Sequence, residues 1–286
     1  MMETNMVPKT GGPSEWDHPL IKYVQVWLWS LWLLLPVAAL AQSAFDGTWK
    51  QRLDSIKITA KPEVFSIVNG TYICSSVSPE IKIMADGQDY PVAGVPHFTL
   101  AVTIVDAHTA RNTWKYAGKI TDVTTITVSA DGSTITGAFT VYDGAKPASG
   151  TYTEKRVAAA PPGAHAVSGS WQITRINSGN DAQTIVSYEM SADGFRMKAM
   201  NGLSYDARFD GKEYPLVGGD PWHSTVTLQR IDDHTVQETD RSSKGKVVEE
   251  IRLVAAKDGK TIEIEDHDLI GGLAGEQTTT YTLDKQ

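Results

Sequence analysis

The sequence predicts an all-β protein made of two tandem copies of one antiparallel, up-and-down β-barrel domain. Three features lead to this prediction: an internal repeat, strands in which apolar and polar residues alternate, and Asp-Gly pairs between these strands. The composition agrees with a globular chain, because 41% of the 286 residues are hydrophobic and 21% are charged. A chain of this length has room for two domains of roughly 100 to 150 residues each.

The repeat is visible as short motifs that recur in the same order. They pair Gly47-Thr48-Trp49 with Gly169-Ser170-Trp171, residues 86–92 with 210–216, and Thr151-Tyr152-Thr153 with Thr280-Tyr281-Thr282. The offset grows from 122 residues at the first pair to 129 at the last, as small loop insertions after a duplication would produce. We therefore expect a first barrel repeat at residues 42–157, an Ala/Pro linker at 158–167 and a second barrel repeat at 168–286.

Within each copy, apolar residues recur at every second position. Leu203, Tyr205, Ala207 and Phe209 alternate with polar neighbours, and Phe195, Met197 and Ala199 do so one strand earlier. This period of two gives each strand one apolar and one polar face. Asp-Gly pairs lie between such runs, where glycine can adopt the positive φ of a tight hairpin, so neighbouring strands should be antiparallel. We expect roughly eight to ten short strands per copy, no amphipathic helix, and a closed barrel or a sandwich.

The beginning of the chain has the features of an export signal. Lys22 precedes an apolar run at residues 26–35, which leads to Ala39-Leu40-Ala41, the small-x-small pattern that signal peptidase reads. We expect residues 1–41 to be a signal peptide with an N-terminal extension, cleaved after Ala41, and the mature protein to be periplasmic or secreted. An uncleaved anchor is the alternative, and membrane contact is expected only through this segment.

The opening of the first repeat, Ala44-Phe45-Asp46-Gly47-Thr48-Trp49-Lys50, resembles the first strand of the lipocalins and fatty-acid-binding proteins, which are calycin-type β-barrels. The second repeat keeps Gly169-Ser170-Trp171. The resemblance implies a lipocalin-like barrel with a lipid ligand, in which the tryptophan closes one end beneath a basic residue of the last strand. The matching basic residues are Lys155 or Arg156 and Lys285. The duplicated Gly-Thr-Trp and Asp-Gly-x-x-Tyr-Pro motifs also resemble those of secreted bacterial proteins.

Other features of the sequence argue against several function classes. The net charge of −8 includes no block of lysine or arginine, which a nucleic-acid groove requires. Cys74 is the single cysteine, so no intramolecular disulfide can form. No Gly-x-Ser-x-Gly, His-Glu-x-x-His or phosphate-binding loop occurs, so we name no catalytic residue, cofactor or metal ligand. His108 and His234 occupy equivalent positions, which we interpret as hairpin turns.

The leading hypothesis is an exported, non-catalytic protein that binds a small apolar or amphipathic molecule inside one or both barrels. We expect ligand contacts from Tyr90 and Tyr214, which precede prolines at equivalent positions, and from Trp222, Phe209 and Met197. One alternative is a structural or interaction module of the cell envelope, in which such large side chains fill both barrels. The other is an exported enzyme whose site has no recognisable motif. Nucleic acid is not an expected partner.

Overall fold

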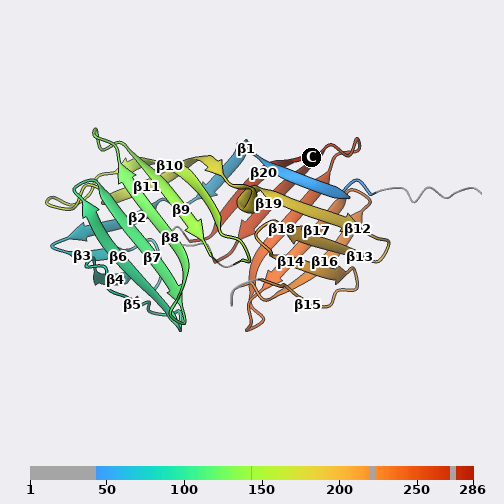
Figure 1. Cartoon of the computed structure of the whole chain (residues 1–286), viewed down its shortest axis with the longest axis horizontal. Coiled ribbons are helices and arrows are strands. Elements are labelled where there is room, and N and C mark those ends of the chain that lie inside the picture. Colours follow the sequence, from blue (N-terminus) through green and yellow to red (C-terminus); the bar gives the residue numbers. More distant parts are fainter. Residues whose placement is uncertain (1–42, 143, 219–222, 271–274) are drawn as a thin grey trace, which may run out of the picture. The chain divides into compact units, whose positions relative to one another are not determined.

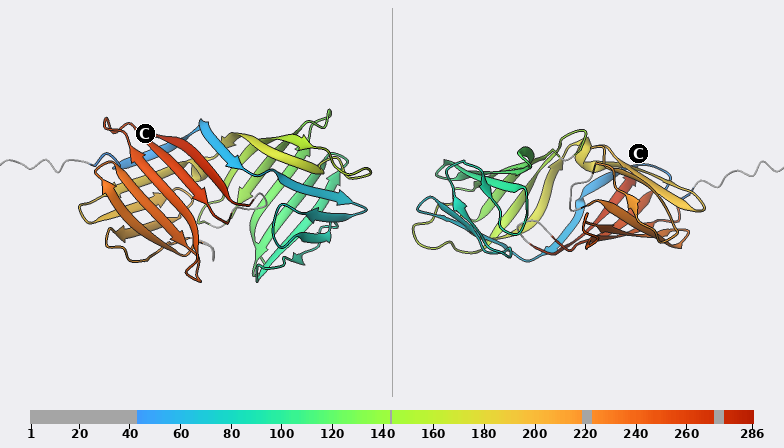
Figure 2. Two further views of the ribbon diagram at one scale, coloured as in Figure 1. Left: turned by 180° about the vertical axis from the view of Figure 1, so that it is seen from behind. Right: turned by 90° about the horizontal axis from the view of Figure 1, so that it is seen from below.

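The computed structural model describes residues 43–142, 144–218, 223–270 and 275–286. It confirms the all-β prediction, because the described chain forms two ten-stranded antiparallel sheets, each curled into a nearly closed barrel (Figure 1). The curl of each sheet is visible from two further sides in Figure 2. Among the described residues the one helix is the short turn α2, Asp181–Thr184. The predicted signal segment, its motif Ala39-Leu40-Ala41 and the predicted ligand residue Trp222 lie outside the described residues.

Barrel 1 is the sheet that contains nine strands of the first repeat and one of the second. Its strand order is β4-β3-β2-β11-β10-β9-β8-β7-β6-β5. The strands are β2 (Glu63–Val68), β3 (Thr71–Cys74), β4 (Ile81–Met84), β5 (Tyr90–Pro91), β6 (Phe98–Asp106), β7 (Thr109–Tyr116), β8 (Lys119–Val128), β9 (Thr134–Val141), β10 (Ala148–Ala158) and β11 (Gly169–Gly179).

Barrel 2 is the sheet that contains nine strands of the second repeat and one of the first. Its strand order is β14-β13-β12-β1-β20-β19-β18-β17-β16-β15. The strands are β1 (Gly47–Ala60), β12 (Ile185–Met190), β13 (Gly194–Ala199), β14 (Ser204–Arg208), β15 (Tyr214–Pro215), β16 (Thr225–Asp232), β17 (Thr235–Arg241), β18 (Val247–Ala255), β19 (Thr261–Asp268) and β20 (Gln277–Lys285).

The two repeats exchange their first strands. β1 pairs with β12 and β20 of the second repeat, and Thr48 lies opposite Ser187. β11 takes the equivalent place in barrel 1, between β2 and β10, with Trp171 opposite Glu63. Figure 1 shows the blue strand β1 beside the red strand β20. Each barrel of the structure therefore contains one strand of the other repeat, while the separate folding of residues 42–157 and 168–286 stays a prediction.

Each sheet nearly closes because its two edges approach each other through a single bridge. In barrel 2, Ser204 and Val217 exchange two backbone hydrogen bonds of 2.9 and 2.8 Å. In barrel 1, Asp86 forms a bridge with Thr103 of β6. Edges that are short and partly bridged leave few unpaired backbone groups open to another chain. Of the two architectures that the sequence left open, the structure has the barrel.

A buried tryptophan closes barrel 2, and the basic residue over it belongs to the other repeat. Trp49 is fully buried, and its indole N–H donates to the carbonyl oxygen of Phe45 at 2.8 Å. The Nζ of Lys285 lies 5.3 Å from the centroid of the Trp49 ring. Gly47 has a φ of +135°, and a Cβ at this position would lie only 2.9 Å from the Lys285 side chain. The lysine side chain could move aside, but the positive φ strongly favours glycine where the strand passes beneath it.

Barrel 1 repeats this geometry with the tryptophan of the second repeat. The Trp171 indole N–H donates to the carbonyl oxygen of Val167 at 2.9 Å. The guanidinium carbon of Arg156 lies 4.0 Å from the centroid of the Trp171 ring. Arg156 also donates to the backbone carbonyl oxygens of Ser168 and Ala166. Of the two candidates in β10, Arg156 is thus the residue that covers the tryptophan.

Candidate functional site

Barrel 1 contains a cavity of about 720 Å³. Much of its wall is apolar or aromatic and includes Phe65, Ile81, Val92, Phe98, Trp114 and Ile126. These residues come from β2, β4, β6, β7, β8 and the residue after β5, so the wall is formed by strands on both sides of the barrel. Small-molecule sites have volumes of roughly 300 to 1,000 Å³, and this cavity lies within that range.

Two carboxyl groups form part of the cavity wall. Glu154 on β10 is 6% exposed, and Glu63 on β2 lies on the other side of β11. No described residue donates a hydrogen bond to either side chain. Burial raises the pKa of Glu154 to about 7, and burial together with the nearby Glu154 raises the pKa of Glu63 to about 8. Both carboxyl groups therefore retain a large protonated fraction near neutral pH.

The other polar groups of the wall come from neighbouring strands. Asn112 on β7 is buried, and Thr124 on β8 donates from Oγ1 to Oδ1 of Asp122 at 3.0 Å. Tyr152 lies beside Glu154 in β10, and burial followed by the charge of Glu154 raises its pKa. The described wall contains no lysine or arginine. The cavity thus combines a mainly apolar surface with acidic groups, which suits an apolar or amphipathic molecule.

The core of barrel 2 is occupied by large side chains. Phe195 packs edge-on against Phe45, with 5.3 Å between ring centroids, and stacks on Tyr188 at 5.2 Å. Met197 and Tyr205 are buried in the same core. A smaller cavity of about 340 Å³ also borders this sheet. Barrel 2 therefore offers less room for a ligand than barrel 1.

Barrel 2 carries four inward carboxyl groups on three adjacent strands. Glu238 and Asp240 on β17 are buried, and Glu249 on β18 and Asp266 on β19 are half-buried. Burial raises the pKa of Glu238 and Asp240 to about 8 and that of Glu249 to about 9. The Tyr205 hydroxyl donates to Oε2 of Glu238 at 2.6 Å, and Nε2 of His223 lies 3.7 Å from Oε2 of Glu249. Within the described ranges, no group of three or more Asp, Glu, His or Cys side chains has a geometry that could hold a metal ion.

Sequence reasoning did not name these buried carboxyl groups, although a signal for them was present. Glu63 is in phase with the inward Phe65 and Ile67 of β2. Glu238 and Asp240 are likewise in phase with Val236 of β17, and all three are buried. Alternation along a strand places such residues on one face. A carboxyl residue in phase with the apolar residues of a strand is therefore expected to face the barrel interior.

The two tyrosines that we expected to contact a ligand form equivalent turns. The Tyr90 hydroxyl donates to Oδ2 of Asp86 at 3.0 Å, and the Tyr214 hydroxyl donates to Oδ2 of Asp210 at 3.1 Å. Each aspartate also accepts from the backbone N–H two residues further on. The repeated Asp-Gly-x-x-Tyr-Pro motif is thus a self-contained turn. Neither tyrosine is among the described residues that line the 720 Å³ cavity, and a ligand contact by either stays a prediction.

The other predicted ligand residues belong to barrel 2 or are not described. Met197 is buried in its core and Phe209 packs against that core, while Trp222 lies outside the described residues. The structure therefore does not bring the four described candidates into one site. Contacts from Met197 and Phe209 to a ligand likewise stay a prediction.

The repeated Asp-x-His-Thr motifs form hairpin turns, as the sequence interpretation expected. The backbone N–H of His108 donates to Oδ1 of Asp106 at 2.8 Å. The backbone N–H of His234 donates to Oδ1 of Asp232 at 2.7 Å. Aspartates commonly stabilise turns in this way. These motifs therefore have a structural explanation in both barrels.

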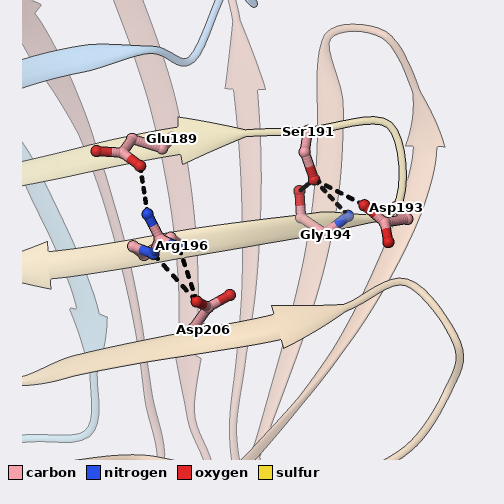
Figure 3. A network of polar contacts seen from close by, with 6 residues as sticks. All are labelled: Glu189, Ser191, Asp193, Gly194, Arg196 and Asp206. Carbon is pink, nitrogen blue, oxygen red and sulfur yellow. Dashed lines mark hydrogen bonds and ion pairs between the residues drawn. The ribbon is translucent and has the colours of Figure 1, made fainter. Parts of the chain in front are cut away.

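A polar network lies on the outer face of barrel 2 (Figure 3). Arg196 on β13 donates to Glu189 on β12 at 2.6 Å and to Asp206 on β14 at 2.8 Å. Ser191 donates to Asp193 within the turn between β12 and β13 at 3.0 Å. The side chains of Arg196, Glu189 and Asp206 are 54%, 70% and 68% exposed. This network lies on the solvated face of three paired strands.

No protein-family model, curated protein or solved structure matches the chain. Among the residues that the structure describes, no helix is both long and apolar enough to cross a bilayer. The functional conclusion therefore depends on the cavity of barrel 1 and on the residues that line it.

Proposed function

We propose that this chain is an exported, non-catalytic protein that binds a small apolar or amphipathic molecule inside barrel 1. The cavity of about 720 Å³ carries the proposal, because a mainly apolar wall with a few polar groups is the usual form of a small-molecule site. Burial of about 400 Å² of apolar surface contributes roughly 10 kcal/mol, and lost freedom of motion costs at least about 4 kcal/mol. The difference corresponds to a dissociation constant of tens of micromolar before polar contacts are added.

A structural role fits barrel 2 better than barrel 1. Its core holds Phe45, Tyr188, Phe195 and Met197 in close contact, and side chains of this size fill an up-and-down barrel. The alternative of a packed structural module is therefore supported for barrel 2 alone. In this proposal, barrel 1 binds the ligand, barrel 2 has a structural role, and the second repeat contributes β11 to barrel 1.

We further propose that the barrels are of the calycin type. Support comes from the basic residue over each tryptophan, Lys285 over Trp49 and Arg156 over Trp171, which is the arrangement that the resemblance implies. The proposed export is supported by Ala39-Leu40-Ala41 after the apolar run. Secreted or periplasmic protein should then begin at Gln42, whereas an intact mass that includes residues 27–32 would indicate an anchor.

Displacement of an environment-sensitive apolar dye tests ligand binding in barrel 1. Asn112 lines the cavity from β7, so Asn112→Phe should fill part of the space and weaken dye binding at least about tenfold. Thr113→Phe, on the opposite face of the same strand, is the matched control and should leave the affinity within about twofold. Equal affinity of the unchanged protein and both variants would place the dye outside barrel 1 and contradict the proposal.

A further inference from the structure

The cavity of barrel 1 is lined by a buried carboxyl group that has no hydrogen-bond or ion-pair partner among the described residues. Glu154 is 6% exposed, and no described residue donates a hydrogen bond to it or forms an ion pair with it. It reaches the cavity from β10, between β9 and β11. The Glu154 carboxyl therefore faces the cavity without a donor from the described residues, and a ligand that carries a hydrogen-bond donor would satisfy it.

A second carboxyl group reaches the same cavity from the other side of the exchanged strand. Glu63 of β2 lies opposite Trp171 of β11, and Glu154 of β10 lies opposite Ile173 of β11. The two carboxyl groups are near enough that the charge of Glu154 raises the pKa of Glu63 in addition to burial. One positively charged group of a ligand could therefore interact with both.

The surroundings of these carboxyl groups disfavour an anionic ligand. The titratable groups near them come from both repeats. They are Asp122 on β8, Tyr152 on β10, Tyr72 and Cys74 on β3, His223 before β16, and Asp268 at the end of β19. The described lining includes no lysine or arginine. A carboxylate headgroup would find no lysine or arginine in the described lining and would further disfavour ionisation of Glu154 and Glu63, whereas an ammonium group would favour their ionised forms and pair with them.

Aromatic side chains of the same wall are suited to the rest of such a ligand. Phe65, Phe98 and Trp114 line the cavity together with Glu63 and Glu154. Aromatic faces contact apolar groups and also attract cations through their electrostatic quadrupole. The wall therefore matches a molecule that has an apolar body and one cationic end.

We propose that barrel 1 selects an amphipathic amine, whose apolar body fills the cavity and whose protonated amino group pairs with Glu154 and Glu63. This inference rests on the proposed function and narrows it to one class of ligand. The charge is opposite to that of a fatty acid. Because a bound ammonium group favours the carboxylate form of both side chains, binding near neutral pH releases protons to the buffer.

Calorimetric titration of the purified full chain with three probes of equal chain length tests the inference. The probes are dodecylamine, dodecanol and dodecanoate, each below its micellar concentration at about pH 7. Dodecylamine should bind at least about tenfold more tightly than dodecanol, and dodecanoate most weakly. Repetition in phosphate and in Tris, which differ in ionisation enthalpy, should change the apparent heat of dodecylamine binding and leave that of dodecanol unchanged.

Conservative variants test whether Glu154 and Glu63 cause the preference for the amine. Glu154→Gln should reduce the preference for dodecylamine over dodecanol at least about threefold, because Glu63 alone then pairs with the amine, and should leave the dodecanol affinity unchanged. Glu63→Gln is the second variant if Glu154→Gln does not fold. Glu263→Gln removes an exposed carboxylate on β19 of barrel 2 and should retain the full preference for the amine.

The outcomes separate this inference from the proposed function. Equal binding of the three probes, or tightest binding of dodecanoate, overturns the amine inference and leaves ligand binding intact. An amine preference that is unchanged in both folded variants, Glu154→Gln and Glu63→Gln, also overturns it. Binding of none of the probes contradicts the inference and the proposed function together.

Discussion

Trp49, in the first strand of the described chain, lies beneath Lys285, in its last strand. β1 reaches this position because it pairs with β20 of the second repeat. Trp171 has the same relationship with Arg156 of the first repeat, at 4.0 Å. Each barrel is thus closed by a tryptophan that belongs to the other repeat, and the two repeats should depend on each other for stability.

Trp171→Ala should lower the free energy of unfolding by about 3 to 5 kcal/mol, because it removes a buried indole and leaves a cavity. The strand exchange predicts which strands lose stability in this variant. Hydrogen–deuterium exchange should show lost protection in β2 and β10 of barrel 1, although Trp171 belongs to the second repeat. Loss of protection confined to barrel 2 would contradict the exchanged pairing.

A disulfide between β1 and β12 tests the strand exchange. Thr48 Oγ1 and Ser187 Oγ lie 3.1 Å apart, so Thr48→Cys combined with Ser187→Cys should oxidise to an intramolecular bond. Ser170, the equivalent of Thr48, lies opposite Val64, so an unexchanged β1 would bring Thr48 to Val64. Thr48→Cys with Val64→Cys is therefore the control, in which no intramolecular bond is expected.

Peptide mapping under non-reducing conditions distinguishes the two cysteine pairs. The native Cys74 is buried, and its replacement by serine in both variants would remove it from the analysis. A disulfide in the control pair and none between positions 48 and 187 would show that each repeat keeps its own first strand.

The buried carboxyl groups of barrel 2 predict that stability falls as the pH rises. The pKa is raised to about 8 for Glu238 and Asp240 and to about 9 for Glu249, while in an unfolded chain such groups have a pKa near 4. Between about pH 4 and about pH 9 the folded state therefore binds more protons than the unfolded state, and the free energy of unfolding decreases with pH. Glu63 and Glu154 of barrel 1 contribute in the same direction.

Melting temperatures measured across this pH range check the prediction. The double variant Glu238→Gln with Asp240→Asn should show a weaker decrease with pH, because two of the contributing groups are absent. Glu263→Gln, an exposed change on β19, should keep the slope of the unchanged protein. A melting temperature that rises from about pH 5 to about pH 9 is incompatible with the raised pKa values.

Two arginines in different surroundings should differ in their effect on stability. Arg156→Ala removes the donor to the backbone carbonyls of Ser168 and Ala166 and uncovers Trp171, and should cost about 2 to 3 kcal/mol. Arg196→Ala removes only exposed ion pairs and should cost less than about 1 kcal/mol. Denaturant unfolding compares the two variants, and equal losses would refute this distinction.

The strands and turns could be predicted because their determinants are local. Alternating apolar residues and Asp-Gly pairs predict antiparallel strands, and each barrel has ten of them. The Asp-Gly-x-x-Tyr-Pro motif likewise depends on residues four apart, as in the contact of Tyr90 with Asp86. The resemblance also implied a basic residue over each tryptophan, which the structure contains.

The exchange and the cavity could not be predicted, because both depend on residues far apart in the sequence. Gly47-Thr48-Trp49 and Gly169-Ser170-Trp171 are so similar that either strand suits either sheet, and their own pattern does not decide between them. The large apolar residues Met197 and Phe209, which we expected to contact a ligand, pack in barrel 2. The larger cavity lies instead in barrel 1, where Glu154 forms part of the wall.

Native mass spectrometry of the gently purified full chain tests the central claim, a ligand held in barrel 1, most directly. The account predicts a protein mass increased by one small molecule, present in Thr113→Phe and absent from Asn112→Phe. A mass without any addition in every preparation, together with no binding of an apolar dye, would contradict the claim, as would an addition that persists unchanged in Asn112→Phe.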